Sequence, residues 1–91
     1  MDAKSAVRLA KEHVLDLFSD EDPSNVGLEE LELDDDGTWQ VTIGFSRPWD
    51  VESKNALSIL VQTASLRRSY KVIQIDDASK RVVSVKNRMA A

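Results

Sequence analysis

Residues 38–46 constrain the fold of this chain more than any other stretch. Apolar side chains occupy every second position there: Trp39, Val41, Ile43 and Phe45. Because successive side chains of a strand point to opposite faces, this alternation predicts a β-strand with one wholly apolar face. Such a face has to be buried, so the strand needs a second layer of structure packed against it.

An amphipathic helix over residues 3–18 can supply that layer. Its apolar residues recur at three- and four-residue spacing and form one stripe: Ala3, Val7, Ala10, Val14, Leu17 and Phe18. Pro23 and the small polar residues around it end the helix. With 91 residues, the chain is long enough for a single domain over residues 1–91, in which helix and sheet share one core.

Residues 26–34 predict a first strand that contains a bulge. Val26 and Leu28 occupy even-numbered positions, whereas Leu31 and Leu33 occupy odd-numbered ones. In a regular strand the two pairs would therefore point to opposite faces. An extra residue near Glu29–Glu30 would bring all four to one face. The Asp35-Asp36-Gly37 sequence then predicts a hairpin into residues 38–46, because glycine accepts the positive φ of a tight turn.

Residues 70–76 and 82–88 predict a second hairpin around a turn at 77–80. The predicted fold class is α+β, with the N-terminal helix packed on a four-stranded antiparallel sheet made of two hairpins. Residues 49–68 are inserted between strands 2 and 3. The stripe through Leu57, Leu60 and Val61 favours a helix for this insertion, and a strand or a mobile loop are the alternatives.

Composition excludes several functional classes. The chain has no cysteine, which excludes disulfides, a thiol nucleophile and cysteine-ligated metals. His13 is the only histidine, so a His-rich metal site is also excluded, and we expect neither metal nor cofactor. No apolar run is long enough to span a bilayer, and the N-terminus does not resemble a signal peptide. We therefore expect a cytoplasmic protein that does not bind membranes.

Charge is divided unevenly along the chain. Residues 1–46 carry 3 basic and 12 acidic side chains, a net −9, and residues 47–91 carry 9 basic and 4 acidic ones, a net +5; the two halves sum to the overall −4. The basic half suggests nucleic-acid contact as an alternative function, through Arg67, Arg68, Lys71, Lys80, Arg81, Lys86 and Arg88. The overall acidity opposes that alternative and makes nucleic acid an unfavoured partner.

The turn at residues 45–50 is the strongest candidate for a binding site. It places Arg47, Trp49 and Asp50 together, and tryptophan and arginine are the residue types that most often anchor interfaces. Arg67, Arg68 and Tyr70 either extend this candidate surface or simply edge the sheet. The alternative for the turn is structural: Trp49 folds back over the end of the core, with Arg47 and Asp50 paired at its edge. We therefore expect a non-catalytic protein-binding or regulatory module that uses this turn and an exposed sheet edge. No catalytic residue is assigned; a small hydrolase around His13 is the third alternative.

The apolar residues of the insertion, Leu57, Leu60 and Val61, are candidates for self-association. If helix and sheet already fill the core, these side chains have to pack elsewhere, and small domains often bury such patches in a homodimer.

Several segments resemble the PepSY-like modules of bacteria, which have a cystatin-like arrangement of one helix and a sheet. These segments are residues 25–30 (NVGLEE), 39–45 (WQVTIGF) and 70–76 (YKVIQID). Residues 75–83 (IDDASKRVV) stand where such modules have a V-D-x-x-T-G-x-V hairpin, with Ser79-Lys80 in place of Thr-Gly. Residues 44–50 are similar to a family of small bacterial proteins with a G-F-S-R-P-W-D segment. The PepSY resemblance implies a role like that of protease propeptides and peptidase inhibitors.

Overall fold

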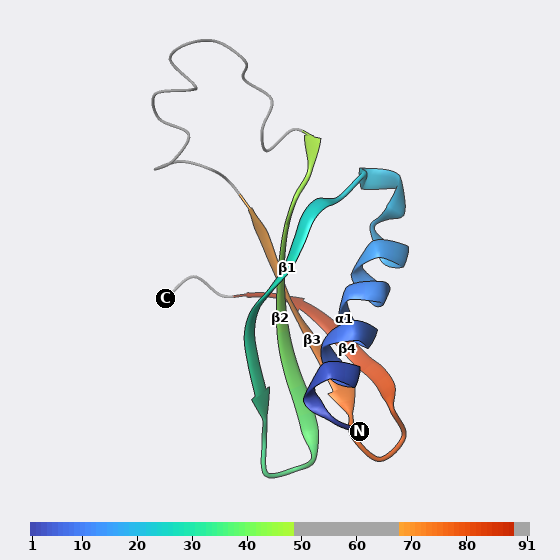
Figure 1. The fold of residues 1–91 in the computed structure, drawn as a ribbon, viewed down its shortest axis with the longest axis vertical. Coiled ribbons are helices and arrows are strands. Elements are labelled where there is room, and N and C mark those ends of the chain that lie inside the picture. The colour runs from blue at the N-terminus through green and yellow to red at the C-terminus, as the bar shows by residue number, and fades with distance from the viewer. Residues whose placement is uncertain (49–67, 89–91) are drawn as a thin grey trace.

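The computed structural model describes residues 1–48 and 68–88, and Figure 1 shows their arrangement. The elements follow in the order α1 (Ala3–Leu17), the short 3₁₀ helix η1 (Ser19–Glu21), β1 (Ser24–Leu33), β2 (Thr38–Ser46), β3 (Ser69–Asp76) and β4 (Arg81–Asn87). The strands form one antiparallel sheet in the order β1-β2-β3-β4, and α1 covers one of its faces. The predicted fold class is therefore confirmed. The predictions for Trp49, Asp50, Leu57, Leu60, Val61 and Arg67 lie outside the described residues.

The core lies between α1 and the middle of the sheet. All four alternating apolar residues of β2, from Trp39 to Phe45, are buried, as the sequence predicted. They pack with Ile73 and Ile75 of the neighbouring strand β3 and with three residues of the helix. Along β2 and β3, Val41 pairs with Ile73 and Trp39 with Ile75, which makes the apolar face continuous across the two strands.

The buried side of the helix differs from the predicted stripe, because it includes Ala6, which lay outside that stripe. Its fully buried residues are Ala6, Ala10 and Val14, whereas Ala3 and Leu17 are exposed. Two of the three buried residues are alanines, whose small side chains let the helix backbone approach the sheet closely. Asp2 caps the helix by accepting a hydrogen bond of 2.8 Å from the Ser5 backbone N–H.

The predicted bulge in β1 is present. The register against β2 shifts between Leu28 and Glu30, and a second shift lies between Ser24 and Gly27. As a result, Leu28, Leu31 and Leu33 lie opposite buried residues of β2 on the helix-covered face.

Both hairpin turns depend on an aspartate side chain. Asp34 accepts backbone hydrogen bonds from Asp36 and Thr38, at 3.0 and 3.1 Å, while Gly37 takes a φ of 78°. The bond from Thr38 is the main reason that the pKa of Asp34 lies below its ordinary value. In the β3–β4 turn, Asp76 accepts in the same way from the Ser79 backbone N–H at 2.8 Å.

Within residues 1–48 and 68–88, no helix is long and apolar enough to cross a membrane.

Candidate binding groove between helix and edge strand

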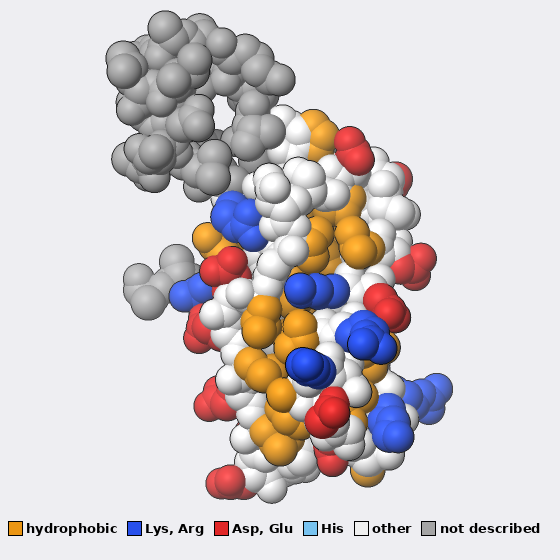
Figure 2. Space-filling view, in the orientation of Figure 1, with side chains coloured by type: hydrophobic (Ala, Val, Ile, Leu, Met, Phe, Trp, Pro, Cys, Tyr) orange, Lys and Arg blue, Asp and Glu red, His pale blue; other side chains and the backbone are white. Residues whose placement is uncertain are grey.

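A groove runs between α1 and β1 on the helix-covered face. It has a volume of about 540 Å³, and its apolar lining includes Val7 and Leu15 of the helix and Leu28 and Leu31 of the strand. Figure 2 shows hydrophobic side chains in the strip between β1 and α1, next to a row of lysine and arginine side chains. The groove therefore combines an apolar floor with a basic rim.

On this face α1 contacts β2 most extensively, and it also contacts β1 and β3. At its N-terminal end, the Met1 ammonium is 3.2 Å from Asp77 Oδ1 in the β3–β4 turn. At its C-terminal end, the ring of Phe18 packs on Phe45 of β2, with 5.3 Å between the ring centroids. These contacts connect the two ends of the helix region to the β3–β4 turn and to β2.

Three leucines of β1 remain partly exposed on this face. Leu28, Leu31 and Leu33 keep 43%, 37% and 48% of their surface exposed, although they face the same side as the core. Apolar residues exposed together beside a concave surface are typical of a site that binds another molecule.

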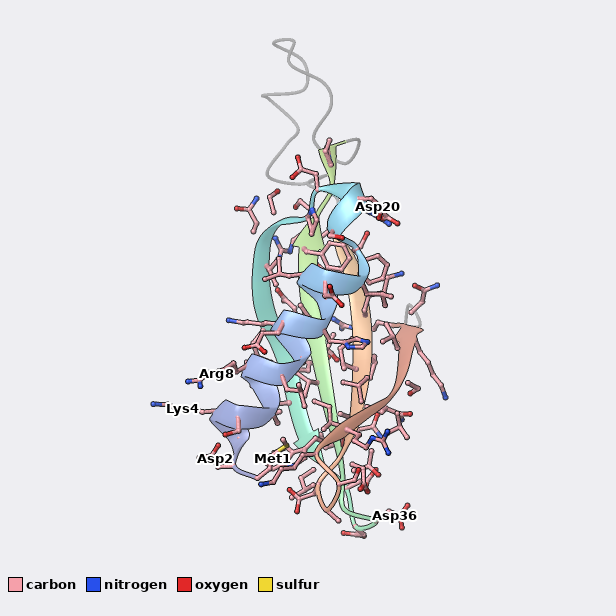
Figure 3. All side chains as sticks on the ribbon, turned by 90° about the vertical axis from the view of Figure 1, so that its right-hand side faces the viewer. Met1, Asp2, Lys4, Arg8, Asp20 and Asp36 are labelled. Atoms are coloured by element: carbon pink, nitrogen blue, oxygen red, sulfur yellow. The ribbon has the colours of Figure 1, made fainter. Side chains whose placement is uncertain are left out.

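Three basic residues of α1 form the rim of the groove. Lys4, Arg8 and Lys11 recur at helical spacing and therefore share one side of the helix, and the groove lining contains a single acidic residue, Glu12. In Figure 3, Lys4 and Arg8 extend from the helix toward the β1 side of the molecule. Among the described residues, none forms an ion pair with these three side chains.

The outer edge of β1 offers backbone groups beside the groove. β1 is at the end of the sheet in the described part of the chain. The Asp34 N–H donates to the Thr38 carbonyl at 3.0 Å, so this pair is a hydrogen-bonded one. Because paired residues alternate along an antiparallel ladder, Leu31 and Leu33 lie in non-hydrogen-bonded pairs, and their N–H and C=O groups point away from β2. Both residues thus present free backbone groups together with exposed leucine side chains on the helix-covered face, and Leu31 also lines the groove.

The structure places Arg47 in an internal cluster at the end of β2. Its Nη1 lies 2.8 Å from Glu21 Oε1, and its Nη2 donates to Ser69 Oγ at 2.6 Å. The guanidinium also lies over the ring of Phe45, 5.8 Å from its centroid. The Arg47 side chain is 21% exposed. It joins η1, β2 and β3.

Arg68 and Tyr70 lie on the opposite face of the sheet from Arg47. Arg68 Nη2 donates to the Asn25 carbonyl at 2.8 Å and lies 3.6 Å from Glu29 Oε2. Tyr70 lies under the guanidinium of Arg88, at 5.3 Å. The structure thus does not bring the three described candidates Arg47, Arg68 and Tyr70 onto one surface.

The basic residues proposed for nucleic-acid contact are also divided between the two faces. Lys71 lies over the ring of Phe18 on the helix side and hydrogen-bonds Asn87. Arg88, on the other face, is 3.3 Å from Glu30. Lys71 and Arg88, two of the described members of this set, therefore do not lie on one face.

His13 is partly buried on α1. In the part of the chain that the structure describes, no group of three or more histidine, aspartate and glutamate residues is placed to hold a metal ion.

The sequence contains a signal for the groove, but the turn at residues 45–50 was preferred as the candidate binding site. All four strands carry apolar residues on one face, which is wider than a single helix of 15 residues with a narrow buried stripe can cover. The large exposed side chains on this face are the leucines of β1. The spacing of Lys4, Arg8 and Lys11 already indicated a basic side of the helix.

A helix followed by a four-stranded antiparallel meander that packs against it is a cystatin-like topology. The chain matches no family model, and comparisons with curated proteins and with solved structures gave no match either.

Proposed function

We propose that this chain is a non-catalytic protein-binding module, acting as an inhibitor or adaptor, that recognises its partner at the edge of β1. The observation that carries this proposal is the coincidence of free backbone groups and exposed leucine side chains at Leu31 and Leu33. Addition of a partner strand to an exposed sheet edge is a common mode of peptide recognition. The groove beside the edge supplies pockets for the side chains of such a strand.

We place recognition at this edge rather than at the two candidate arginines. The guanidinium groups of Arg47 and Arg68 already bind Glu21 and Glu29, respectively. A partner that used either arginine would have to break an internal ion pair and leave a glutamate without it. The basic rim of the groove requires no such exchange.

The PepSY-like assignment is part of the same proposal. The order of helix and strands agrees with it. So does the β3–β4 turn, where Lys80 has a φ of 60° at the position of the glycine in the V-D-x-x-T-G-x-V pattern. A positive φ is what glycine favours, so the backbone of this turn fits that pattern although the residue differs.

Selection of peptides from a random display library on the full chain tests the proposal. Selected peptides are synthesised, and their Kd values are measured on wild type and on two variants, Leu31→Asp and Val83→Asp. Both residues are exposed apolar residues on edge strands, Leu31 on β1 and Val83, which is 64% exposed, on β4. The two variants therefore differ in the location of the new charge rather than in its kind.

We expect Leu31→Asp to weaken the selected peptides by more than about tenfold, because it places a carboxylate on the floor of the groove. Val83→Asp should leave their Kd values unchanged. Equal loss in both variants, or binding that neither substitution affects, would reject β1 as the recognition site. Circular dichroism of both variants ensures that the comparison is made between folded proteins.

A further inference from the structure

We propose that the groove selects an extended segment that adds to β1 as a fifth antiparallel strand. In this segment, acidic and apolar residues are in phase, that is, they occupy alternate positions whose side chains point to the same face. This inference rests on the proposed function and specifies the chemistry of the partner. It follows from the different charges on the two sides of the β1 edge.

The backbone of β1 determines where a fifth strand can form. The regular part of the edge runs from Glu30 to Leu33, because the register shifts on its N-terminal side. Within it, Leu31 and Leu33 direct their N–H and C=O groups outward. A partner strand therefore forms its hydrogen-bonded pairs with these two residues, and the partner residues opposite them point their side chains to the helix side.

The helix side of this edge favours apolar and acidic residues. Partner side chains opposite Leu31 and Leu33 extend the apolar floor of the groove. The helix side of this edge also carries the basic rim, where Lys4, Arg8 and Lys11 have no ion-pair partner among the described residues. A carboxylate in phase with the apolar pair is therefore attracted to the rim.

The other side of the edge disfavours acidic residues. Glu30 and Glu32 pair with Thr42 and Gln40 of β2 and so lie on the face away from the helix. Glu30 is 3.3 Å from Arg88, but both glutamates are exposed. Partner carboxylates out of phase with the leucines would lie beside these two glutamates and be repelled. The same repulsion disfavours a second copy of β1 as the occupant.

Two blocked peptides of identical composition test the phase. In the first, Glu-Lys-Leu-Thr-Leu-Lys-Glu, the glutamates share the phase of the leucines. In the second, Lys-Glu-Leu-Thr-Leu-Glu-Lys, the lysines do. We expect the first peptide to bind wild type more tightly by roughly tenfold, through ion pairs with the rim. In the double variant Lys4→Glu/Arg8→Glu, the preference should reverse.

N-methylation of the same peptide tests strand addition. Methylation of the nitrogen of either leucine removes a hydrogen bond to the β1 edge and should weaken binding by more than about tenfold. Methylation of the threonine nitrogen, which points away from β1, serves as the matched control and should leave the Kd unchanged.

Three results would overturn this inference. One is equal affinity of wild type for the two peptides. Another is that methylation of a leucine nitrogen and methylation of the threonine nitrogen change the Kd equally. The third is a dimer, seen by light scattering after size exclusion, that the first peptide does not dissociate, because a second copy would then occupy the edge. All three leave the proposed function standing if peptides from the display library still lose binding in Leu31→Asp. If that dependence is also absent, the proposed function fails as well.

Discussion

The indole of Trp39 donates a hydrogen bond of 2.9 Å from Nε1 to Oδ1 of Asp77, although 38 positions separate the two residues. This bond connects the start of β2 to the turn between β3 and β4. The Asp77 backbone N–H also donates to the Gly37 carbonyl at 2.9 Å, so the turns of the two hairpins are joined directly. With the Met1 ammonium 3.2 Å from the same carboxylate oxygen, Asp77 holds together three segments at one end of the molecule.

Asp77 should make the stability of the protein depend on pH in the acid range. The hydrogen bond from Trp39, and then that from the N-terminal ammonium, hold the pKa of Asp77 below its ordinary value. A carboxylate with a lowered pKa stabilises the fold above its ordinary pKa of about 3.9, and this contribution is lost as the pH falls through the lowered value. Asp77→Asn keeps an oxygen acceptor for Trp39 but removes the charge. We therefore expect its urea midpoint to lie below that of wild type at neutral pH.

The test is the difference between the two midpoints, measured from pH 7 downward. This difference should narrow as the pH falls below about 3.9, because a protonated Asp77 resembles the asparagine. Asp35→Asn, in the exposed neighbouring turn, controls for a change of net charge alone and should follow wild type throughout. A constant difference between wild type and Asp77→Asn across the whole range would show that the charge of Asp77 contributes nothing.

Most of the fold could be predicted from local sequence patterns. The alternation in β2 fixes which face is buried, and the bulge in β1 follows from the change of parity between Leu28 and Leu31. Turn residues such as Gly37 mark the ends of strands. The position of the helix across the sheet could not be predicted in this way. It depends on contacts between distant residues, such as Phe18 with Phe45, for which a local pattern carries no signal.

Lys80 should be a site where glycine stabilises the protein. Its φ is 60°, in the left-handed region, and its backbone N–H donates to the Asp76 carbonyl at 2.8 Å. Because a Cβ atom disfavours this conformation by roughly 1 kcal/mol, we expect Lys80→Gly to raise the free energy of unfolding by about 0.5–1 kcal/mol. Urea denaturation measures the change.

Two variants control for this effect. Lys80→Ala removes the same side chain but keeps the Cβ, so it should not stabilise the protein. Ser79→Gly introduces a glycine at a neighbouring position without a positive φ, and we expect it to be neutral or destabilising. If Lys80→Ala raises the free energy of unfolding as much as Lys80→Gly does, the gain comes from the lost lysine and not from the backbone.

The candidate site was harder to predict than the fold. The sequence suggested one candidate surface for Arg47, Arg68 and Tyr70, and the structure places Arg47 on the other face of the sheet from Arg68. The partner of Arg68, Glu29, is 39 positions away on β1, and nothing in the local sequence pairs the two. An arginine near a turn is equally consistent with an internal ion pair and with a binding surface until its neighbours are known.

Gly44 should be less tolerant of substitution than Gly27, its partner across β1 and β2. A Cβ at Gly44 would lie 3.0 Å from Arg68 Nη2 and 3.0 Å from Glu29 Oε2, so both side chains would have to move and their ion pair would be disturbed. At Gly27, the nearest atom would be 3.9 Å away, an ordinary contact. We expect Gly44→Ala to destabilise the protein by about 1 kcal/mol.

Gly27→Ala should be neutral or slightly stabilising, because it restricts the unfolded chain without creating a clash. Thermal unfolding of the two variants side by side measures the difference. Equal midpoints would mean that Arg68 and Glu29 move aside at no cost, and their ion pair would then have no measurable role in holding β1 to β3.

Arg47 offers a test that separates an internal role from a binding role. Its guanidinium reaches Glu21 and Ser69 at the same time, which the single ammonium of a lysine cannot reproduce. We expect Arg47→Lys to lower the free energy of unfolding by about 1–2 kcal/mol, whereas Arg81→Lys, at an exposed position of β4, should change it little.

In a double-mutant cycle, Arg47→Lys and Glu21→Gln should be coupled by roughly 0.5–1 kcal/mol, because the pair is only partly exposed. The same variants are then assayed with the peptides selected on wild type. If Arg47→Lys leaves stability unchanged but abolishes peptide binding, the arginine belongs to the recognition surface, and the edge of β1 is not the whole site.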